Sequence, residues 1–182
     1  MEHYSDDKLL EMFRDKKSRN YAYNLIVRKH QEQLYWHIRR MVIVHEDADD
    51  VLQNTLIKAW KGLLNFKEES KIYTWLYRIA SNEAITFLNK KKKRFFISLN
   101  DVEQELANHL ESDESYSGDE IQLKLQKAIL TLPEKQRLVF NMKYFQELKY
   151  EEISDILETS VGGLKASYHL ATKKIEAYLK DD

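Results

Sequence analysis

One short stretch of the sequence, KIYTWLYR at residues 71–78, brings together side chains suited to holding nucleic acid. Aromatic rings can stack on unpaired bases, and neighbouring cations can hold the phosphates between those bases. The side chains concerned are Lys71, Tyr73, Trp75, Tyr77 and Arg78. The run Lys90–Arg94 adds consecutive cations, which repel one another unless phosphates supply the countercharge. A buried core would also explain the rings, and a solvated helix end would also explain the cations.

A second polar cluster has residue types that could bind a cation. It comprises His45, Glu46, Asp47, Asp49 and Asp50. A hard divalent cation needs several carboxylates that converge from fixed positions. Consecutive carboxylates at the start of a helix instead diverge around its axis, where they stabilise the positive end of the helix dipole. The cluster therefore predicts a helix N-terminus, and we expect no metal site.

Composition argues against several other kinds of chemistry. The chain has 182 residues, with four glycines, one proline and no cysteine. The lack of cysteine excludes a disulfide framework and a thiolate metal site. Four glycines leave little material for glycine-rich phosphate loops, and no nucleophile and base have a supporting spacing. We therefore expect a protein that is not an enzyme, with no catalytic residue and no cofactor.

The distribution of apolar residues indicates a soluble protein. Hydrophobic residues make up 43% of the chain, which is enough for real cores, but no apolar run could span a bilayer. The N-terminus, MEHYSDDKLLEMF, is acidic and amphipathic, where a signal peptide would be basic and then apolar. We expect a cytoplasmic protein without membrane insertion.

Scarce glycine and proline, together with abundant helix formers, predict an all-α fold. The formal net charge of -1 conceals three unequal blocks. Residues 1–97 carry 19 Lys and Arg against 13 Asp and Glu, residues 98–120 carry none against 8, and residues 121–182 carry 10 against 9. We expect two small helical domains, residues 1–97 and 121–182, joined by an acidic flexible linker at 98–120. That linker could be a soluble spacer, or it could compete with nucleic acid for the basic domain.

Helical signals are frequent in the first block. Ser5, followed by two aspartates, predicts a helix N-terminus, and a long amphipathic helix is expected from about Tyr21 to Met41. In HEDADDVLQNTLIKAWKGLLNF one face is apolar, and Ile57 on the polar face suggests a surface for a protein partner. On a helical wheel of residues 71–89, Trp75 lies on a broad apolar arc and is expected in the core. The opposite side contains Thr74, Arg78, Asn82, Ile85 and Asn89 and is mostly polar.

The second block has the spacing of a helix-turn-helix. A short helix, YEEISDIL, is followed by the turn ETS, in which Ser160 is a natural N-cap for a longer last helix. Small residues at the start of that helix would let backbone amides approach a phosphate, and a lysine would add charge. The free face comprises Gly162, Gly163, Lys165, Ser167, His169, Thr172 and Lys173. A plain helical hairpin with no DNA role remains an alternative.

Taken together, the two blocks resemble a known family. The stretches DADDVLQNTLIKAW, WLYRIASNEAITFLNKKKKR and LPEKQRLVFNMKYFQELKYEEISDILETSVGGLKASYHLATKKI are similar to the sigma-two and sigma-four domains of a bacterial RNA polymerase sigma factor. The greatest similarity is to the short extracytoplasmic-function class of the sigma-70 family. The resemblance covers nearly the whole chain, in the right order and with the expected linker between the two domains.

The resemblance implies a transcription initiation factor that binds core RNA polymerase, recognises the −10 and −35 promoter elements and assists DNA strand opening. The residues implied to contact the polymerase are Asp49, Asp50, Gln53, Asn54 and Ile57. Those implied to hold the upstream melting element, where a loop before Trp75 captures a flipped base, are Lys67, Lys71, Tyr73, Arg78, Asn82, Asn89, Lys90 and Lys91. Those implied to lie near the distal element are Ser160, Gly162, Gly163, Lys165, Ser167 and His169. The implied partners are core RNA polymerase and promoter DNA, and an anti-sigma factor is a further candidate.

The chain departs from the family pattern at two positions. Ser167 stands where an arginine, the commonest guanine reader, is usual, which predicts a differently specified distal contact. Thr86 stands where an aspartate is frequent.

Two other classes of function stay open. A stand-alone helix-turn-helix regulator would explain the second block but would leave the basic first block unused. A protein-interaction module would explain the amphipathic helices without DNA. Binding to core polymerase distinguishes these classes, because only a sigma factor requires it.

Overall fold

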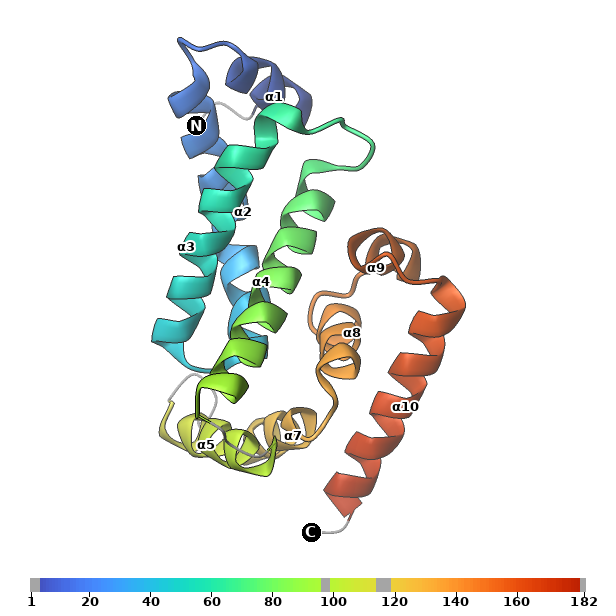
Figure 1. The fold of residues 1–182 in the computed structure, drawn as a ribbon. Coiled ribbons are helices and arrows are strands. Elements are labelled where there is room, and N and C mark those ends of the chain that lie inside the picture. Colours follow the sequence, from blue (N-terminus) through green and yellow to red (C-terminus); the bar gives the residue numbers. More distant parts are fainter. Residues whose placement is uncertain (1–3, 96–98, 114–118, 181–182) are drawn as a thin grey trace.

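The structure is a computed structural model in which residues 4–95, 99–113 and 119–180 are described. Within those ranges every regular element is helical, which confirms the all-α fold (Figure 1). The helices are α1 (Asp6–Arg14), α2 (Arg19–Val42), α3 (His45–Gly62), α4 (Ile72–Phe95), α5 (Leu99–Ser112), α7 (Glu120–Leu130), α8 (Glu134–Tyr144), α9 (Tyr150–Leu157) and α10 (Val161–Lys180). A short 3-10 turn, Leu63–Asn65, follows α3. None of the helices in the described ranges is both long enough and apolar enough to cross a membrane.

The N-terminal domain is built on the three long helices α2, α3 and α4, which pack against one another, with α1 across one end (Figure 1). The helix predicted from Tyr21 to Met41 is confirmed as the main part of α2. Each helix turns an apolar face inward, and removal of these faces from water is the main force that holds the domain together. Its largest fully buried side chains include Phe13, Ile26, Leu34, Ile38, Met41, Ile72, Leu76 and Leu88.

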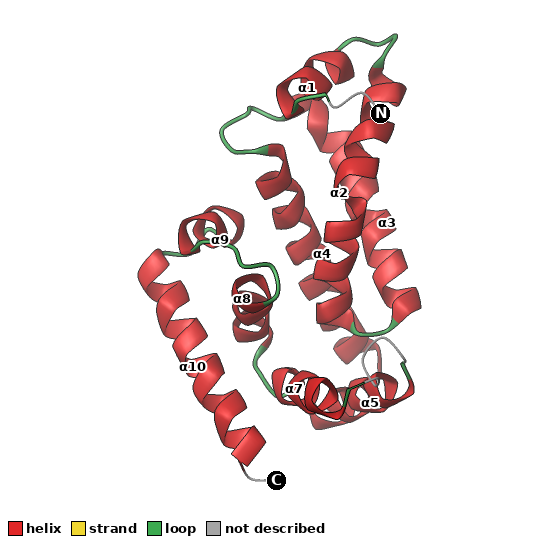
Figure 2. Cartoon of the chain, turned by 180° about the vertical axis from the view of Figure 1, so that it is seen from behind, coloured by secondary structure: helices red, strands yellow, loops and turns green. Residues whose placement is uncertain are grey.

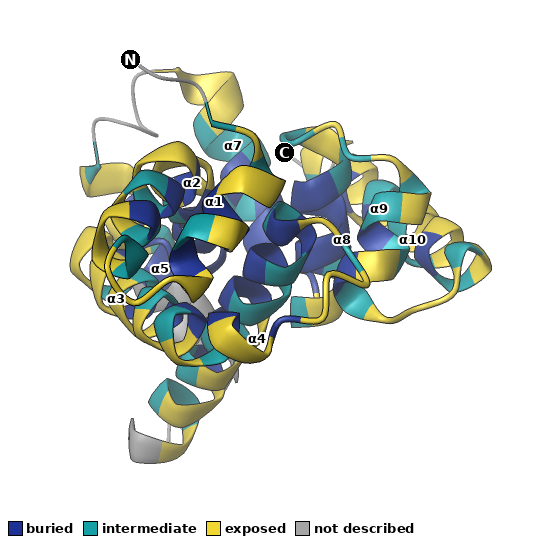
Figure 3. Ribbon diagram, turned by 90° about the horizontal axis from the view of Figure 1, so that it is seen from above, coloured by how far each residue is buried: buried dark blue, intermediate teal, exposed yellow. Residues whose placement is uncertain are grey.

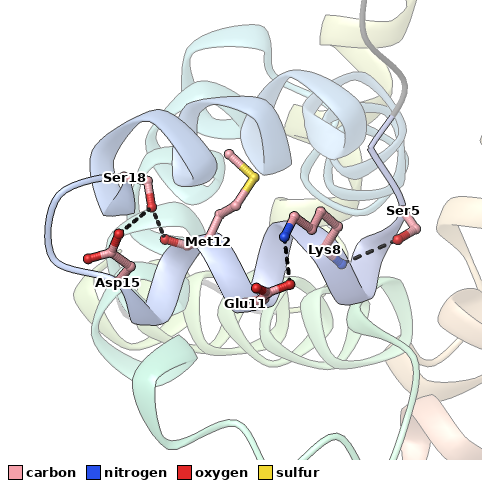
Figure 4. A network of polar contacts seen from close by, with 6 residues as sticks. All are labelled: Ser5, Lys8, Glu11, Met12, Asp15 and Ser18. Carbon is pink, nitrogen blue, oxygen red and sulfur yellow. Dashed lines mark hydrogen bonds and ion pairs between the residues drawn. The ribbon is translucent and has the colours of Figure 1, made fainter.

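The ends of α1 are fixed by side chains that bond to the backbone (Figure 4). Ser5 is the predicted N-cap, and its hydroxyl oxygen accepts a hydrogen bond from the amide of Lys8 at 3.3 Å. Lys8 pairs with Glu11 at 2.8 Å on the exposed side of the helix. At the other end, the Ser18 hydroxyl donates to the carbonyl of Met12 at 2.7 Å and fastens the turn into α2. Local polar groups thus define both ends, as the sequence predicted for the first.

The acidic segment between the basic first block and the near-neutral second block contains the helix α5, which packs against α7 (Figure 1). Leu106 and Leu110 of α5 are buried against Ile43, in the corner between α2 and α3, and against Leu130 at the end of α7. Asp113, just after α5, pairs with the buried Arg39 of α2. The acidic linker therefore includes an amphipathic helix whose two leucines reach both domains.

The C-terminal domain consists of α7, α8, α9 and α10, and it contains the predicted helix-turn-helix. The short helix α9 ends at Leu157, Glu158 adopts a left-handed conformation with φ 52°, and α10 begins at Val161. This confirms the short helix, the three-residue turn and the longer helix expected from the sequence. A separate apolar cluster holds α7, α8 and α10 together and comprises Ala128, Ile129, Leu132, Phe140, Ala171 and Ile175.

The two domains lie in contact, with α8 and α9 against α2 and α4 (Figure 2). One apolar cluster includes side chains from both domains, and buried positions follow this seam when the molecule is viewed from above (Figure 3). Two buried polar residues of α8 reach the C-terminal end of α2: Arg137 donates to the carbonyl of Met41 at 3.5 Å, and Asn141 donates to that of Arg40 at 3.3 Å. These donors lie where the carbonyls of a helix end lack partners within the helix.

Candidate nucleic-acid interface

A polar pocket of about 570 Å³ lies at the start of α4, beside the loop that connects it to α3. The exposed Lys67 lies on its wall, together with Trp75 and Arg78 of α4. Trp75 packs on Phe66 with ring centroids 5.1 Å apart, and Gly62 permits this position because a Cβ there would lie 2.9 Å from the indole. The pocket thus offers an aromatic ring and two cations, which is the combination that unpaired nucleic acid requires. Three acidic residues, Glu69, Asp155 and Glu158, also line it.

The three aromatic side chains of KIYTWLYR have different environments. Tyr77 is 5% exposed and belongs to the core, and Trp75 is half-buried. Tyr73 is half-buried, and its hydroxyl donates to a carboxylate oxygen of Glu152 in α9 at 2.8 Å. Burial, together with this carboxylate, raises the pKa of Tyr73 to about 12. The hydrogen bond from the backbone amide of Lys149, followed by that from Tyr73, lowers the pKa of Glu152, so the pair remains phenol and carboxylate.

The polar side of α4 is only partly open to solvent. Asn82 and Asn89 are exposed as the wheel predicted, whereas Ile85 is half-buried and packs against the core. Lys90 is also exposed, and so is Lys71 in the preceding loop. Thr74 is 4% exposed, so its predicted place on a solvent-facing stripe is wrong, because α9 covers this part of α4.

Three cations of α4 have acidic partners in the structure. Arg78 pairs with Glu158 at 2.9 Å and also donates to the carbonyl of Asp155 at 2.5 Å. Lys91 pairs with Asp47 of α3 at 3.2 Å, and Lys92 pairs with Glu134 of α8 at 2.6 Å. The side chain of Arg94, the last cation of the run, lies outside the part of the chain that the structure describes.

A second candidate surface lies on the side of α3 away from the core. All five residues assigned to it are exposed, and they are Asp49, Asp50, Gln53, Asn54 and Ile57. Ile57, at 47% exposed, is the one large apolar side chain among the five. The structure thus brings the five residues onto one helix face and leaves that face open.

The acidic cluster at the start of α3 has the expected helical geometry. Glu46 and Asp47 lie in the first turn, where the helix dipole favours negative charge. His45 bonds to the hydroxyl of Tyr35 at 2.6 Å and approaches Asp49 at 3.4 Å. Among the described residues, no group of three or more His, Cys, Asp and Glu side chains could hold a metal ion.

The third candidate surface is the N-terminal half of α10. Ser160 caps this helix as predicted, because its hydroxyl oxygen accepts a hydrogen bond from the amide of Gly163 at 3.2 Å. Gly162, Lys165 and His169 are exposed, whereas Gly163 and Ser167 are half-buried. A Cβ at Gly162 would meet nothing within 4 Å, so the backbone is open to a ligand there. The ammonium of Lys165 lies 5.8 Å from the centre of the Tyr150 ring, at the edge of the same surface.

Comparison with known proteins gives one consistent result. The family model described as Sigma-70 region 2 matches residues 26–94, and that described as Sigma-70, region 4 matches residues 122–175. The RNA polymerase sigma-H factor of Pseudomonas aeruginosa is 33% identical over 169 residues, which cover 87% of this chain and 86% of that protein. The ECF RNA polymerase sigma factor SigW of Bacillus subtilis is 30% identical over 174 residues, which cover 91% of this chain and 93% of that protein.

A solved structure shows the same fold. CnrH, in complex with the cytosolic domain of CnrY, superposes with a TM-score of 0.70 at 22% sequence identity. The superposition covers 97% of this chain and 98% of CnrH. The arrangement of helices in both domains is therefore an arrangement already known from experiment.

Proposed function

The chain belongs to the sigma-70 family of RNA polymerase sigma factors, in its extracytoplasmic-function class, and we propose from this premise how its three candidate surfaces divide the work of transcription initiation. The protein is an initiation factor: it binds core RNA polymerase, directs it to promoters and assists strand opening. The observation that carries this conclusion is the match to region 2 and region 4, in that order, on one chain. We further propose that it acts in the cytoplasm and performs no bond chemistry itself, since its relatives are named as sigma factors.

The pocket at the start of α4 is proposed to hold the melted strand of the upstream promoter element. Lys67 and Arg78 lie on its wall beside Trp75, so a flipped base could enter next to an aromatic ring with cations near its phosphates. Extraction of a base from a duplex costs a few kcal/mol, which stacking and hydrogen bonds in the pocket can offset. Residues 1–97 are proposed as the domain that contains this pocket and the polymerase surface.

The start of α10 is proposed to lie in the major groove of the distal promoter element, within a domain of residues 121–182. Its open backbone at Gly162 and the charge of Lys165 suit phosphate contacts, which fix the register of a helix on DNA. Ser167 is half-buried and cannot form the two-pronged contact that an arginine makes with guanine. We therefore propose that this chain recognises a distal element through contacts other than an arginine at that position.

The direct test of the function is reconstitution with core RNA polymerase from the same host. The purified chain is mixed with core enzyme, the complex is isolated by size exclusion, and the transcripts that it starts on fragmented genomic DNA are sequenced. Discrete start sites that share two upstream elements are expected. A chain that binds DNA but never binds core enzyme would instead be a stand-alone helix-turn-helix regulator.

Replacement of Asp50 and Gln53 by alanine should weaken the complex with core polymerase by at least about tenfold, because both side chains lie on the open face of α3. Folding should be unaffected, since neither side chain is buried. The measurement is titration of core enzyme with fluorescently labelled protein. The matched control replaces Glu32 and Gln33, an exposed acid and amide on α2, and should bind core enzyme like the parent chain. Equal affinity of the two double variants for core enzyme would remove the α3 face from the proposal.

Replacement of Lys165 by alanine should reduce promoter-dependent transcription about fivefold and lower the salt slope of promoter binding by about one charge. The affinity for core polymerase should not change, because Lys165 lies on α10, away from the α3 face. Lys174 is the matched control, since it is exposed on the same helix and nine residues further, on the opposite side. If the two single variants lost promoter activity equally, Lys165 would not be a specific DNA contact.

A further inference from the structure

A second pocket, of about 510 Å³, lies where the loop between α8 and α9 faces α4 (Figure 2), with α2 as a further wall. Its volume is within the range of small-molecule sites, about 300–1,000 Å³, which are common at domain interfaces. Tyr73 lines this pocket rather than the pocket at the start of α4, so its ring is not part of the proposed strand-opening site. Four aromatic side chains line the second pocket, and they are Trp36, Tyr73, Tyr77 and Phe145.

One face of α2 supplies an acid, a ring and a cation to this pocket in a fixed order. Glu32, Trp36 and Arg40 all line it, and they follow one another at intervals of four residues, about 6 Å apart along the helix axis. Glu32 and Trp36 are exposed. The Arg40 guanidinium lies over the ring of Phe145 at 4.7 Å and over that of Trp36 at 5.8 Å. This wall therefore combines a hydrogen-bond acceptor, a stacking surface and a positive charge over about 12 Å.

The loop between α8 and α9 adds a second acceptor, the side-chain amide of Gln146. Its nitrogen donates to Nδ1 of the buried His37 at 2.9 Å. The oxygen of the same amide, Oε1, is buried and finds no hydrogen-bond partner among the described residues. A buried acceptor without a partner carries a desolvation cost that a hydrogen bond would remove. A ligand with an N–H group beside Gln146 would supply that bond.

These groups match the parts of a guanine nucleotide. A purine base is flat and stacks on an aromatic ring such as that of Trp36. The edge of guanine carries neighbouring N–H donors, and the Glu32 carboxylate and the Gln146 oxygen are acceptors. Adenine has a ring nitrogen without hydrogen where guanine has one of these donors. The phosphate of a nucleotide is negatively charged, and the Arg40 guanidinium attracts it.

From this match we propose that the pocket is a binding site for a guanine mononucleotide, with the base on Trp36, its donor edge toward Glu32 and Gln146, and its phosphate toward Arg40. The inference goes beyond the proposed function and does not depend on it, because it involves neither the polymerase surface nor the strand-opening pocket. The bound nucleotide contacts both domains of the folded chain, so it also raises the temperature at which the chain unfolds.

The test is calorimetric titration of the full-length chain with GMP, without polymerase or DNA. The expected dissociation constant is about 10–100 μM. AMP should bind at least about tenfold more weakly, because it leaves buried acceptors without donors. Guanosine, which lacks the phosphate, should bind about fivefold more weakly than GMP. If GMP gave no binding heat at about 1 mM, or if GMP and AMP bound equally, the inference would be overturned.

Two variants with matched controls locate the site. Trp36→Ala should weaken GMP binding at least about tenfold, whereas Tyr21→Ala, an exposed aromatic residue of the same helix outside the pocket, should not change it. Glu32→Gln keeps the shape of the side chain and should reduce the preference for GMP over AMP about fivefold. Its control is Glu176→Gln, an exposed acid of α10. Equal GMP affinities of Trp36→Ala and Tyr21→Ala would exclude this pocket as the site.

Competition with a single-stranded trinucleotide of sequence TGT identifies the source of the guanine. Both results below support guanine recognition in the pocket. If TGT displaces GMP only at a large excess, the ligand is a free nucleotide, and if it displaces GMP at equal concentration, the ligand is an exposed guanine of a nucleic acid.

Reconstitution with core polymerase keeps this inference separate from the function. A chain that binds GMP but forms no complex with core enzyme would lose the proposed function and retain the nucleotide site. A chain that forms the complex but does not bind GMP would lose only the nucleotide site.

Discussion

Replacement of Phe13 by alanine should lower the free energy of unfolding of the N-terminal domain by about 3–5 kcal/mol. Phe13 is 1% exposed and attaches α1 to the rest of the domain. Its ring meets that of Trp60 edge-on at 5.2 Å and that of Tyr23 at 6.0 Å. Tyr23 cannot move to fill the space, because its hydroxyl donates to the carbonyl of Leu56 at 2.5 Å. The site therefore retains a cavity, and loss of packing adds to loss of apolar transfer energy.

Urea unfolding followed by tryptophan fluorescence measures this effect directly, because Trp60 lies against the substituted ring. Tyr21 is the matched control, since it is an aromatic residue of α2 that is 54% exposed. Its replacement by alanine should change the free energy of unfolding by no more than about 0.5 kcal/mol. If Phe13→Ala cost no more than Tyr21→Ala, α1 would not depend on this aromatic contact.

The features that were predicted correctly from the sequence are those that local interactions decide. Ser5 and Ser160 cap their helices through amides only three residues away, and such pairs are visible in a linear pattern. The turn between α9 and α10 follows from the same local rules, as does the exposed face of α3 around Ile57. These features need no knowledge of which helix packs against which.

The polar stripe of α4 could be predicted only in part. A helical wheel divides a helix into one buried and one exposed side, which suits a helix that has neighbours on one side only. The helix α4 has α2 and α3 on one side and α9 on another, so Thr74 is buried while Asn82 remains exposed. The ion pair of Arg78 with Glu158 joins residues far apart in the sequence, and no spacing rule indicates it.

Buried polar residues were missed for a related reason. Arg137, Asn141 and His37 are each at most 4% exposed, although the sequence places them among ordinary polar residues. Their partners are backbone carbonyls or side chains on other helices, such as the carbonyl of Leu130 for Arg137 at 2.7 Å. A buried polar group is tolerated where such partners exist, and the fold alone determines where they are.

The second prediction with a large effect concerns His37, a fully buried residue of α2 at the seam between the domains. Its Nε2 lies 2.9 Å from the hydroxyl of Ser81 in α4, and that hydroxyl donates to the carbonyl of Tyr77 at 2.7 Å. Ser81 therefore accepts from Nε2–H. The amide of Gln146, between α8 and α9, then donates to the remaining nitrogen, Nδ1, at 2.9 Å. The bond from Gln146 requires neutral imidazole, because both nitrogens of a protonated ring are donors and Nδ1 could then accept nothing.

Burial, assisted by the nearby positive charge of Arg40, lowers the pKa of His37 from 6.5 to about 3. The other ionisable group at the ring is Tyr77, whose own pKa is raised to about 12 by burial, so it stays neutral in acid. Between pH 6.5 and about 3 the unfolded chain binds a proton at this position that the folded chain does not. Stability therefore falls as the pH is lowered, by about 1.4 kcal/mol per pH unit from this residue, and is unaffected by it above pH 6.5.

Urea unfolding of the parent chain and of His37→Gln at several pH values from 7 down to about 4 tests this contribution. Glutamine does not titrate, so the variant starts less stable at neutral pH because it loses the bond from Gln146 to the ring. The difference between the two free energies should then shrink by about 1.4 kcal/mol for each pH unit below 6.5. His169→Gln, which replaces an exposed histidine of α10, should keep the pH dependence of the parent chain. Parallel curves for His37→Gln and the parent chain would mean that His37 is protonated equally in both states. A converging pair would show that His37 remains neutral in the folded chain over this pH range while the same residue is protonated in the unfolded chain.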